Sequence, residues 1–243
     1  TMGAPLGAGR VVVIAVHGRG AAPGNILDLA PAIGNAHVTF LAPAAAGGTW
    51  YPKGFMAPVA ENEPGITSAI SVVHALIDDA VAHGVPAERI VLMGFSQGAC
   101  LSVTAAQRRP ARYGGVLVYS GGLIGPPGTQ WSTGGDFGGT PIFFGCSDVD
   151  GHIPADRVRE SATHLEQMGA AMKKYEVRRT KYETQGIRLL QSLYFALLTS
   201  LFTLRSSNFA LRGCMPSLAH ASQMLATRVA WSDQWPSWPA RSY

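Results

Sequence analysis

The chain has 243 residues, of which 47% are hydrophobic and 14% are charged. This composition excludes a disordered chain and supplies enough apolar side chains for a sizeable core. The formal net charge of +4 is unevenly placed, because residues 1–172 carry 9 Lys and Arg against 12 Asp and Glu, whereas residues 173–243 carry 10 against 3. The basic balance therefore belongs to the tail, and nucleic-acid binding by the whole protein is not indicated.

Three cysteines, Cys100, Cys146 and Cys214, are odd in number and far apart in the sequence. They do not suggest a disulfide framework or a zinc site, and they fit a reducing compartment. No signal peptide is recognisable, and the longest uncharged apolar stretch, residues 189–204, is short for a membrane span. We expect a cytoplasmic protein without stable membrane insertion.

Short apolar runs alternate with helical patterns along the first 177 residues. The runs that predict strands are 11–16, 38–42, 89–93, 115–119, 141–144 and 172–177, and the patterns that predict helices are 66–81, 97–108 and 157–168. Because strands that alternate with helices pair in parallel, we expect an α/β fold with a mostly parallel, doubly wound sheet in one domain. Ligands of such sheets bind at the carboxyl ends of the strands.

The segment Gly94-Phe95-Ser96-Gln97-Gly98 matches the pattern G-x-S-x-G. It directly follows a predicted strand and opens a predicted helix, which is the setting of a nucleophile elbow. The sharp turn exposes the serine Oγ and places a helix N-terminus behind the developing oxyanion. The pattern predicts Ser96 as a nucleophile.

Other motifs stand in a characteristic order around this one. They are His17-Gly18-Arg19-Gly20, Trp50-Tyr51-Pro52, Glu61-Asn62-Glu63-Pro64-Gly65-Ile66 and Asp150-Gly151-His152-Ile153-Pro154. With them, residues 10 to about 177 resemble the phospholipase/carboxylesterase family of the α/β-hydrolase fold, which includes acyl-protein thioesterases and bacterial serine esterases. The resemblance implies hydrolysis of an ester or thioester through an acyl-enzyme, and it implies no cofactor.

A tetrahedral intermediate needs at least two N–H donors aimed at its oxyanion. The residue after the nucleophile supplies one, the backbone N–H of Gln97. The resemblance places the second on the backbone N–H of Arg19, whose side chain we expect to be free to shape specificity or to bind an anion. We expect His17 to orient this loop and to transfer no proton.

Two acids, Asp148 and Asp150, follow the predicted strand 141–144. A catalytic triad needs one carboxylate that holds the tautomer of the base. The spacing to Pro154 resembles the family's D-x-x-[VI]-P pattern and favours Asp150, whereas counting from Gly145 favours Asp148 as the alternative acid. A metal site built on these acids is not expected, because no other ligand cluster supports it.

The base is the most difficult residue to assign. In the family it follows the last strand, but the histidines after Asp150 are only His152, His164 and His220. His164 lies within a predicted helix, where a surface role is expected, whereas His220 preserves the chain order Ser, Asp, His. We therefore assign His220 as the base.

The predicted hydrolase domain covers residues 10–177, and residues 178–243 form an atypical C-terminal segment with only 2 of the 29 glycines. Residues 187–204 predict a strongly apolar helix, so we expect this segment to be helical and to pack on the same domain. A second interpretation is that the family's own C-terminus has been replaced. The added helix is compatible with a homodimer.

We predict a serine carboxylesterase whose partner is a small-molecule ester with a short acyl chain. A lysophospholipase or acyl-protein thioesterase is the alternative with the same chemistry, because the apolar helix and the basic residues 173–181 would suit an anionic interface. The alternative of another class is a hydrolase-fold binding protein whose catalysis is impaired by the lack of a working base.

Overall fold

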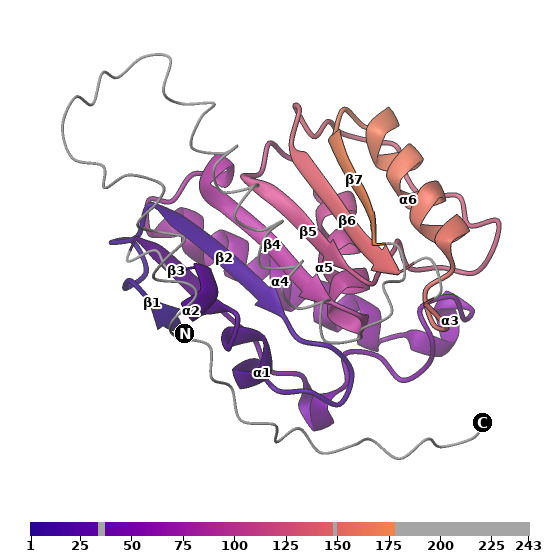
Figure 1. Ribbon diagram of the computed structural model, residues 1–243, viewed down its shortest axis with the longest axis horizontal. Coiled ribbons are helices and arrows are strands. Elements are labelled where there is room, and N and C mark those ends of the chain that lie inside the picture. The colour runs from indigo at the N-terminus through magenta and orange to yellow at the C-terminus, as the bar shows by residue number, and fades with distance from the viewer. Residues whose placement is uncertain (34–36, 148–149, 178–243) are drawn as a thin grey trace. The chain divides into compact units, whose positions relative to one another are not determined.

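The computed structural model describes residues 1–33, 37–147 and 150–177 (Figure 1). These residues contain a seven-stranded sheet with the strand order β1-β3-β2-β4-β5-β6-β7. The strands are β1 (Met2–Gly3), β2 (Val11–Val16), β3 (Val38–Leu41), β4 (Ile90–Phe95), β5 (Gly115–Tyr119), β6 (Pro141–Ser147) and β7 (Ala171–Val177).

The sheet is parallel except for β1, which pairs antiparallel with β3. The register places Val16 of β2 beside Gly94 of β4, Phe95 beside Tyr119 of β5, and Tyr119 beside Gly145 of β6. Four neighbouring strands therefore approach the same edge of the sheet with their carboxyl ends. The predicted α/β class with a mostly parallel sheet is confirmed.

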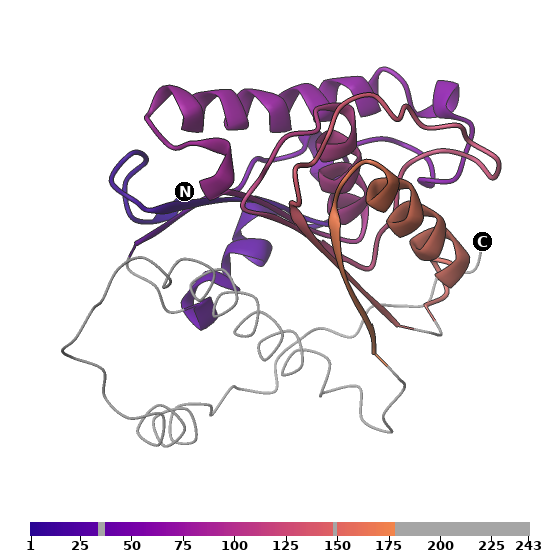
Figure 2. The same ribbon diagram turned by 90° about the horizontal axis from the view of Figure 1, so that it is seen from above.

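Helices cover both faces of the sheet (Figure 2). The longer ones, on one face, are α4 (Gly65–Ala82), α5 (Gln97–Arg108) and α6 (Ala155–Gln167), and the short α1 (Pro23–Leu27) and α2 (Ala30–Ile33) lie on the other. The connections also contain α3 (Val59–Asn62) and the 3₁₀ turns η1 (Ala46–Gly48) and η2 (Ala87–Arg89).

The burial pattern of β2 shows why an uninterrupted apolar run forms a central strand. Val12, Ile14 and Val16 pack in the core under α4, α5 and α6, whereas Val13 and Ala15 pack in the core on the opposite face. Successive side chains of a strand point to opposite faces, so a strand covered on both sides needs an apolar residue at every position.

The predicted helices match the observed ones closely: residues 66–81 correspond to α4, residues 97–108 to α5, and residues 157–168 to α6, which begins two residues earlier. The sequence analysis missed β1 and the short helices α1, α2 and α3. These elements have five residues or fewer, too few to show a repeat of hydrophobicity.

By length and composition, α4 passes the test for a helix that could cross a membrane. One side of this helix, including Ile66, Ile70, Val73 and Ile77, is buried in the core. Because one side of α4 packs on the core, its length and composition are weak evidence for a membrane span. The predicted boundary between the hydrolase domain and the C-terminal segment stays a prediction, because residues 178–243 lie outside the described residues.

Candidate active site

Ser96 is the single residue between the end of β4 and the start of α5. Its backbone has φ 53° and ψ −118°, a left-handed conformation that is strained for a serine. The Ser96 N–H donates to the carbonyl of Tyr119 at 2.9 Å, and the Ser96 carbonyl accepts from the N–H of Cys100 at 3.0 Å. Hydrogen bonds on both sides therefore hold the strained residue in place.

Two glycines make the turn around Ser96 sterically possible. A Cβ at Gly94 would lie 2.3 Å from the carbonyl oxygen of Gly98, and a Cβ at Gly98 would lie 2.2 Å from that of Val16. The first contact closes the turn itself, and the second packs the start of α5 against the end of β2. Both contacts are too short for any other residue, so the G-x-S-x-G spacing follows from the backbone geometry.

The loop after β2 lies against Ser96. A Cβ at Gly18 would lie 3.5 Å from the Cβ of Ser96 and 3.3 Å from the carbonyl oxygen of Phe95. Gln97 is the first residue of α5, where backbone N–H groups have no acceptor within the helix. The structure thus brings together Ser96, Gln97 and the loop that contains Arg19.

The side chain of Arg19 is engaged, so the expectation that it is free is wrong. Its Nη1 donates to the carbonyl of Pro52 at 3.0 Å, and its Nη2 donates to the carbonyls of Tyr51 at 3.0 Å and Lys53 at 2.6 Å. The guanidinium carbon also lies 6.0 Å from the centroid of the Tyr51 ring. A planar fork of donors suits several neighbouring carbonyls at once, and residues 51–53 supply three consecutive ones.

His17 is 1% exposed, and both of its ring nitrogens are occupied. Nδ1 lies 2.8 Å from the carbonyl oxygen of Gly18, and Nε2 lies 3.2 Å from the backbone nitrogen of Ala45. Because a backbone N–H can only donate, Nε2 is the acceptor and Nδ1 carries the proton. The ring also packs against that of Trp50, tilted by 36°, and the Trp50 Nε1 donates to the His17 carbonyl at 2.8 Å. His17 therefore orients the loop.

Two buried amide side chains hold the segment that Arg19 binds. Gln97 accepts the N–H of Trp50 at 3.1 Å and donates to the carbonyl of Tyr51 at 2.8 Å. Asn62, which is 0% exposed, accepts the N–H of Lys53 at 2.7 Å. The sequence analysis missed these side-chain roles, although each residue lies within a motif that it quoted.

Asp150 follows β6 at the same edge of the sheet. Its Oδ1 accepts the N–H groups of His152 at 2.8 Å and Ile153 at 3.1 Å, and its Oδ2 lies 3.8 Å from the Sγ of Cys146. A triad acid needs one oxygen fixed by the backbone and one available to an imidazole, and a carboxylate that closes a local turn makes similar bonds. The triad role of Asp150 stays a prediction, and Asp148 lies outside the described residues.

The assigned base, His220, also lies outside the described residues. His164 lies in α6, where its Nε2 is 3.1 Å from the carbonyl oxygen of Ser132 and its ring is 5.5 Å from that of Trp131. His164 thus attaches a loop to α6, as a structural residue would. The role of His220 stays a prediction.

No metal-binding group of three His, Cys, Asp or Glu occurs in the described part of the chain. Cys100 lies one turn after Ser96 and is 1% exposed. Burial raises the pKa of its thiol to about 12, so the thiol stays protonated at neutral pH. Cys100 is therefore no competing nucleophile.

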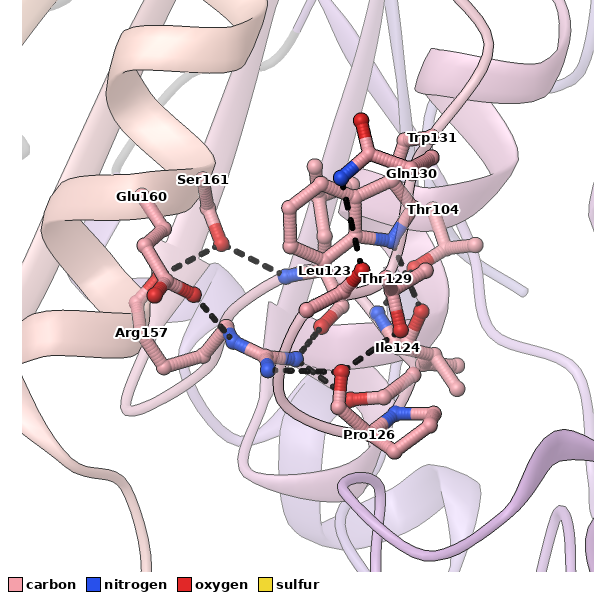
Figure 3. Close-up of polar contacts among 12 residues, drawn as sticks. Thr104, Leu123, Ile124, Pro126, Thr129, Gln130, Trp131, Arg157, Glu160 and Ser161 are labelled. Carbon is pink, nitrogen blue, oxygen red and sulfur yellow. Dashed lines mark hydrogen bonds and ion pairs between the residues drawn. The ribbon is translucent and has the colours of Figure 1, made fainter.

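Behind the elbow, Arg157 of α6 fixes the loop that follows β5 (Figure 3). Its side chain is 1% exposed. Nη1 donates to the carbonyls of Leu123 at 3.0 Å and Gly125 at 2.6 Å, Nη2 donates to that of Pro126 at 3.2 Å, and Nε binds the Glu160 carboxylate at 3.0 Å. Sequence reasoning missed this residue, because an arginine in a charged helix is typical of an exposed face.

Aromatic rings complete the surroundings of Arg157. Its guanidinium carbon lies 5.1 Å from the centroid of the Trp131 ring and 6.0 Å from that of Phe55. Phe55 accepts the N–H of Gly125 at 2.9 Å. Arg157 therefore connects the loop after β5 with the segment that follows the Arg19-bound carbonyls.

A family model described as Phospholipase/Carboxylesterase matches residues 4–191. The chain belongs to the phospholipase/carboxylesterase family. Among solved structures, a phospholipase/carboxylesterase from Dyadobacter fermentans is 35% identical, with a TM-score of 0.73 over 80% of this chain and 94% of that chain. The resemblance seen in the sequence motifs is confirmed.

Another solved structure and two curated proteins are also similar to this chain. A carboxylesterase from Bacillus cereus is 17% identical, with a TM-score of 0.59 over 77% of this chain and 89% of that chain, which identifies the α/β-hydrolase fold alone. Acyl-protein thioesterase 1 of Eremothecium gossypii is 38% identical over 105 residues, 41% of this chain, and that of Schizosaccharomyces pombe is 41% identical over 63 residues, 26% of this chain. The matches span only 43% and 28% of the length of these curated relatives.

Proposed function

We propose that this protein is a cytoplasmic serine carboxylesterase that hydrolyses small, short-acyl esters through an acyl-enzyme. The observation that carries the proposal is the strained Ser96 at the strand–helix turn, with the Gly18–Arg19 loop against it. A serine held at positive φ is strained, and such strain is concentrated at functional sites. In a nucleophile elbow this conformation exposes the serine Oγ at the edge where the parallel strands end.

In the proposed mechanism, the Ser96 Oγ attacks the ester carbonyl carbon while the imidazole of His220 takes its proton. Asp150 holds the imidazole in the required tautomer and stabilises the imidazolium. The carbonyl oxygen becomes an oxyanion, which the backbone N–H groups of Arg19 and Gln97 stabilise. Collapse breaks the bond to the alcohol, which takes the proton from the imidazolium, and water releases the acid from the acyl-enzyme by the same steps.

A second candidate, an acyl-protein thioesterase, has the support of the relatives from Eremothecium gossypii and Schizosaccharomyces pombe, which are named acyl-protein thioesterase 1. Its thioester carbonyl would meet the same nucleophile and the same donors. Activity on p-nitrophenyl esters of increasing acyl length, compared with that on an S-palmitoylated peptide, discriminates the two. A preference for acetyl or butyryl esters supports the carboxylesterase, and a preference for the peptide supports the thioesterase.

The nucleophile is tested by labelling with a fluorophosphonate probe and by Ser96→Ala. We expect one covalent label on the peptide that contains residues 94–98 and a loss of kcat by several orders of magnitude in the variant. Ser68→Ala, at an exposed position in α4, is the matched control and should behave like the wild type. Labelling elsewhere, or activity that survives Ser96→Ala, would contradict the proposal.

The acid and the base are tested by Asp150→Asn, Asp148→Asn and His220→Ala. We expect Asp150→Asn to lower kcat by roughly 10³- to 10⁴-fold, because the wrong tautomer is then held, and Asp148→Asn to have a far smaller effect. The reverse order would reassign the acid to Asp148. Weak activity that requires Ser96 but is unchanged in His220→Ala would reject this base and favour the impaired hydrolase.

A further inference from the structure

One backbone carbonyl, that of Tyr51, accepts hydrogen bonds from side chains of two separate segments. Arg19 Nη2 donates to it at 3.0 Å and Gln97 Nε2 donates at 2.8 Å. Arg19 comes from the loop after β2, and Gln97 begins α5. These are the two residues whose backbone N–H groups are the proposed oxyanion donors.

We propose that Arg19 is a positioning residue: its guanidinium and the Gln97 amide, bound to the shared Tyr51 carbonyl, fix the separation of the two oxyanion donors. This inference rests on the proposed serine-esterase function. It assigns a role to a side chain in a reaction that otherwise requires only the backbone of that residue.

The two donors need such a link, because they are held by different parts of the fold. Gln97 is held in α5, whereas Arg19 lies three residues beyond the end of β2 and is exposed. Backbone bonds hold the rest of its loop: Gly20 N–H donates to Gly48 at 2.8 Å, and Ala21 N–H donates to Gly18 at 3.2 Å. Oxyanion stabilisation requires donors about 2.7–3.1 Å from the oxygen, so a small displacement of either one is costly.

The Tyr51 segment is a firm anchor for this link. The Tyr51 residue is 2% exposed, and a Cβ on the neighbouring Gly65 would lie 3.1 Å from its Cα. Asn62 fixes the next turn through the N–H of Lys53 at 2.7 Å. A charged donor makes stronger bonds to carbonyls than a neutral one, so the three bonds of Arg19 attach its loop to the buried Tyr51 and to the exposed Pro52 and Lys53 that follow it.

The charge of Arg19 offers a competing explanation, because a nearby cation would also stabilise an oxyanion through space. The geometry points instead to the hydrogen bonds of the guanidinium, which we call the Arg19 clamp, since both terminal nitrogens donate to carbonyls of residues 51–53. Lysine keeps the charge but lacks the planar fork. Arg19→Lys therefore separates the two explanations, while Arg19→Met removes both charge and clamp.

The experiment compares Arg19→Met, Arg19→Lys and the control Arg112→Met with the wild type. Arg112 is also exposed and donates to one loop carbonyl, that of Gly138, outside the site described above. We expect Arg19→Met to lower kcat roughly tenfold to a hundredfold, with KM changed less than about twofold, because a misplaced donor weakens transition-state binding alone. Arg19→Lys should stay well below the wild type, and Arg112→Met should match it.

Amide hydrogen exchange provides a measurement that does not depend on activity. In Arg19→Met, peptides that cover residues 17–20 and 50–54 should exchange faster than in the wild type, and in Arg112→Met they should not. Full recovery of kcat in Arg19→Lys would assign the effect to charge and overturn the clamp. Unchanged exchange in Arg19→Met would overturn it whether or not the enzyme is active.

The proposed function fails in a different way, through absent labelling or activity independent of Ser96. A double-mutant cycle with Gln97→Met adds a test of the shared carbonyl. If both side chains act through Tyr51, their effects on kcat should be non-additive. Strict additivity would reject the shared anchor. Should Gln97→Met not fold, the Arg19 variants and hydrogen exchange still decide the question.

Discussion

Two arginines hold loops near the elbow with the same set of contacts in opposite surroundings. Each donates to three backbone carbonyls that lie 31 to 34 residues away in the chain, and each lies near an aromatic ring. The Arg157 side chain is 1% exposed, whereas Arg19 is exposed. The same chemistry thus occurs once inside the protein and once at its surface.

Each arginine with its three bound carbonyls forms a clamp, and burial decides whether that clamp contributes to the free energy of unfolding. In the protein interior, a carbonyl or guanidinium that loses its partner cannot form a replacement hydrogen bond with water. Loss of the Arg157 contacts therefore carries the full desolvation cost of these groups. At the surface, water replaces lost partners, so the Arg19 contacts contribute little to the free energy of unfolding. These contacts can instead fix the position of the loop that carries Arg19. We therefore expect Arg157 to act on stability and Arg19 to act on activity.

The largest expected effect is that of Arg157→Met on stability. The change leaves the carbonyls of Leu123, Gly125 and Pro126 without their donor, and we expect it to lower the free energy of unfolding by about 3–5 kcal/mol. Urea denaturation monitored by circular dichroism measures this. A loss below about 1 kcal/mol would mean that burial does not separate the two clamps.

Alkaline pH should destabilise the protein without involving either arginine, because arginine keeps its charge there. Burial raises the pKa of Tyr119 to about 12 from the ordinary tyrosine value of 10.0. The folded state thus favours the neutral phenol, so its contribution is complete below pH 10 and is lost as pH rises toward 12. The loss amounts to about 1.4 kcal/mol per pH unit for this group.

The variant Tyr119→Phe isolates this contribution, because it keeps the ring and removes the titration. Its free energy of unfolding should fall less steeply than that of the wild type between pH 10 and 12. Arg19→Met serves as the control and should keep the wild-type slope. Equal slopes for Tyr119→Phe and the wild type would contradict the assignment of alkaline instability to this phenol.

Trp131→Phe should have a smaller effect on the free energy of unfolding, and it tests the contribution of the aromatic ring beside Arg157. The change removes the bond from the indole N–H to the carbonyl of Ile124 at 2.9 Å and weakens the contact with the Arg157 guanidinium. We expect a loss of about 1–2 kcal/mol in the free energy of unfolding. In the Arg157→Met background the loss should be smaller, since one of the two contacts is already gone.

The smallest expected effect on stability is that of Arg19→Met. Two of its three contacts are exposed and the third is only part-buried, so we expect the free energy of unfolding to fall by less than about 1 kcal/mol, while kcat falls as proposed above. The same denaturation curves that test Arg157 measure it. A destabilisation as large as that of Arg157→Met would remove the contrast between the two clamps.

Sequence alone predicted the strand–turn–helix elbow at Ser96, because much of its shape is decided locally. Gly94 and Gly98 flank Ser96 within five residues. The contact that requires Gly94 arises inside that turn, with Gly98, whereas the contact that requires Gly98 is with Val16 of β2. The apolar run 11–16 predicted a strand buried on both faces for a similar reason, since each residue faces one core or the other.

Only the tertiary structure decided the contacts of the two arginines. The residues next to Arg19 and Arg157 in the sequence do not predict which carbonyls these arginines bind. The bound carbonyls belong to other segments, and a backbone carbonyl is the same in every residue type. The fold likewise decided that β1 joins the sheet antiparallel to β3. Hydrophobic periodicity and turn motifs reflect the local conformation of the backbone. Polar contacts between residues more than thirty positions apart depend on how the strands and helices pack together.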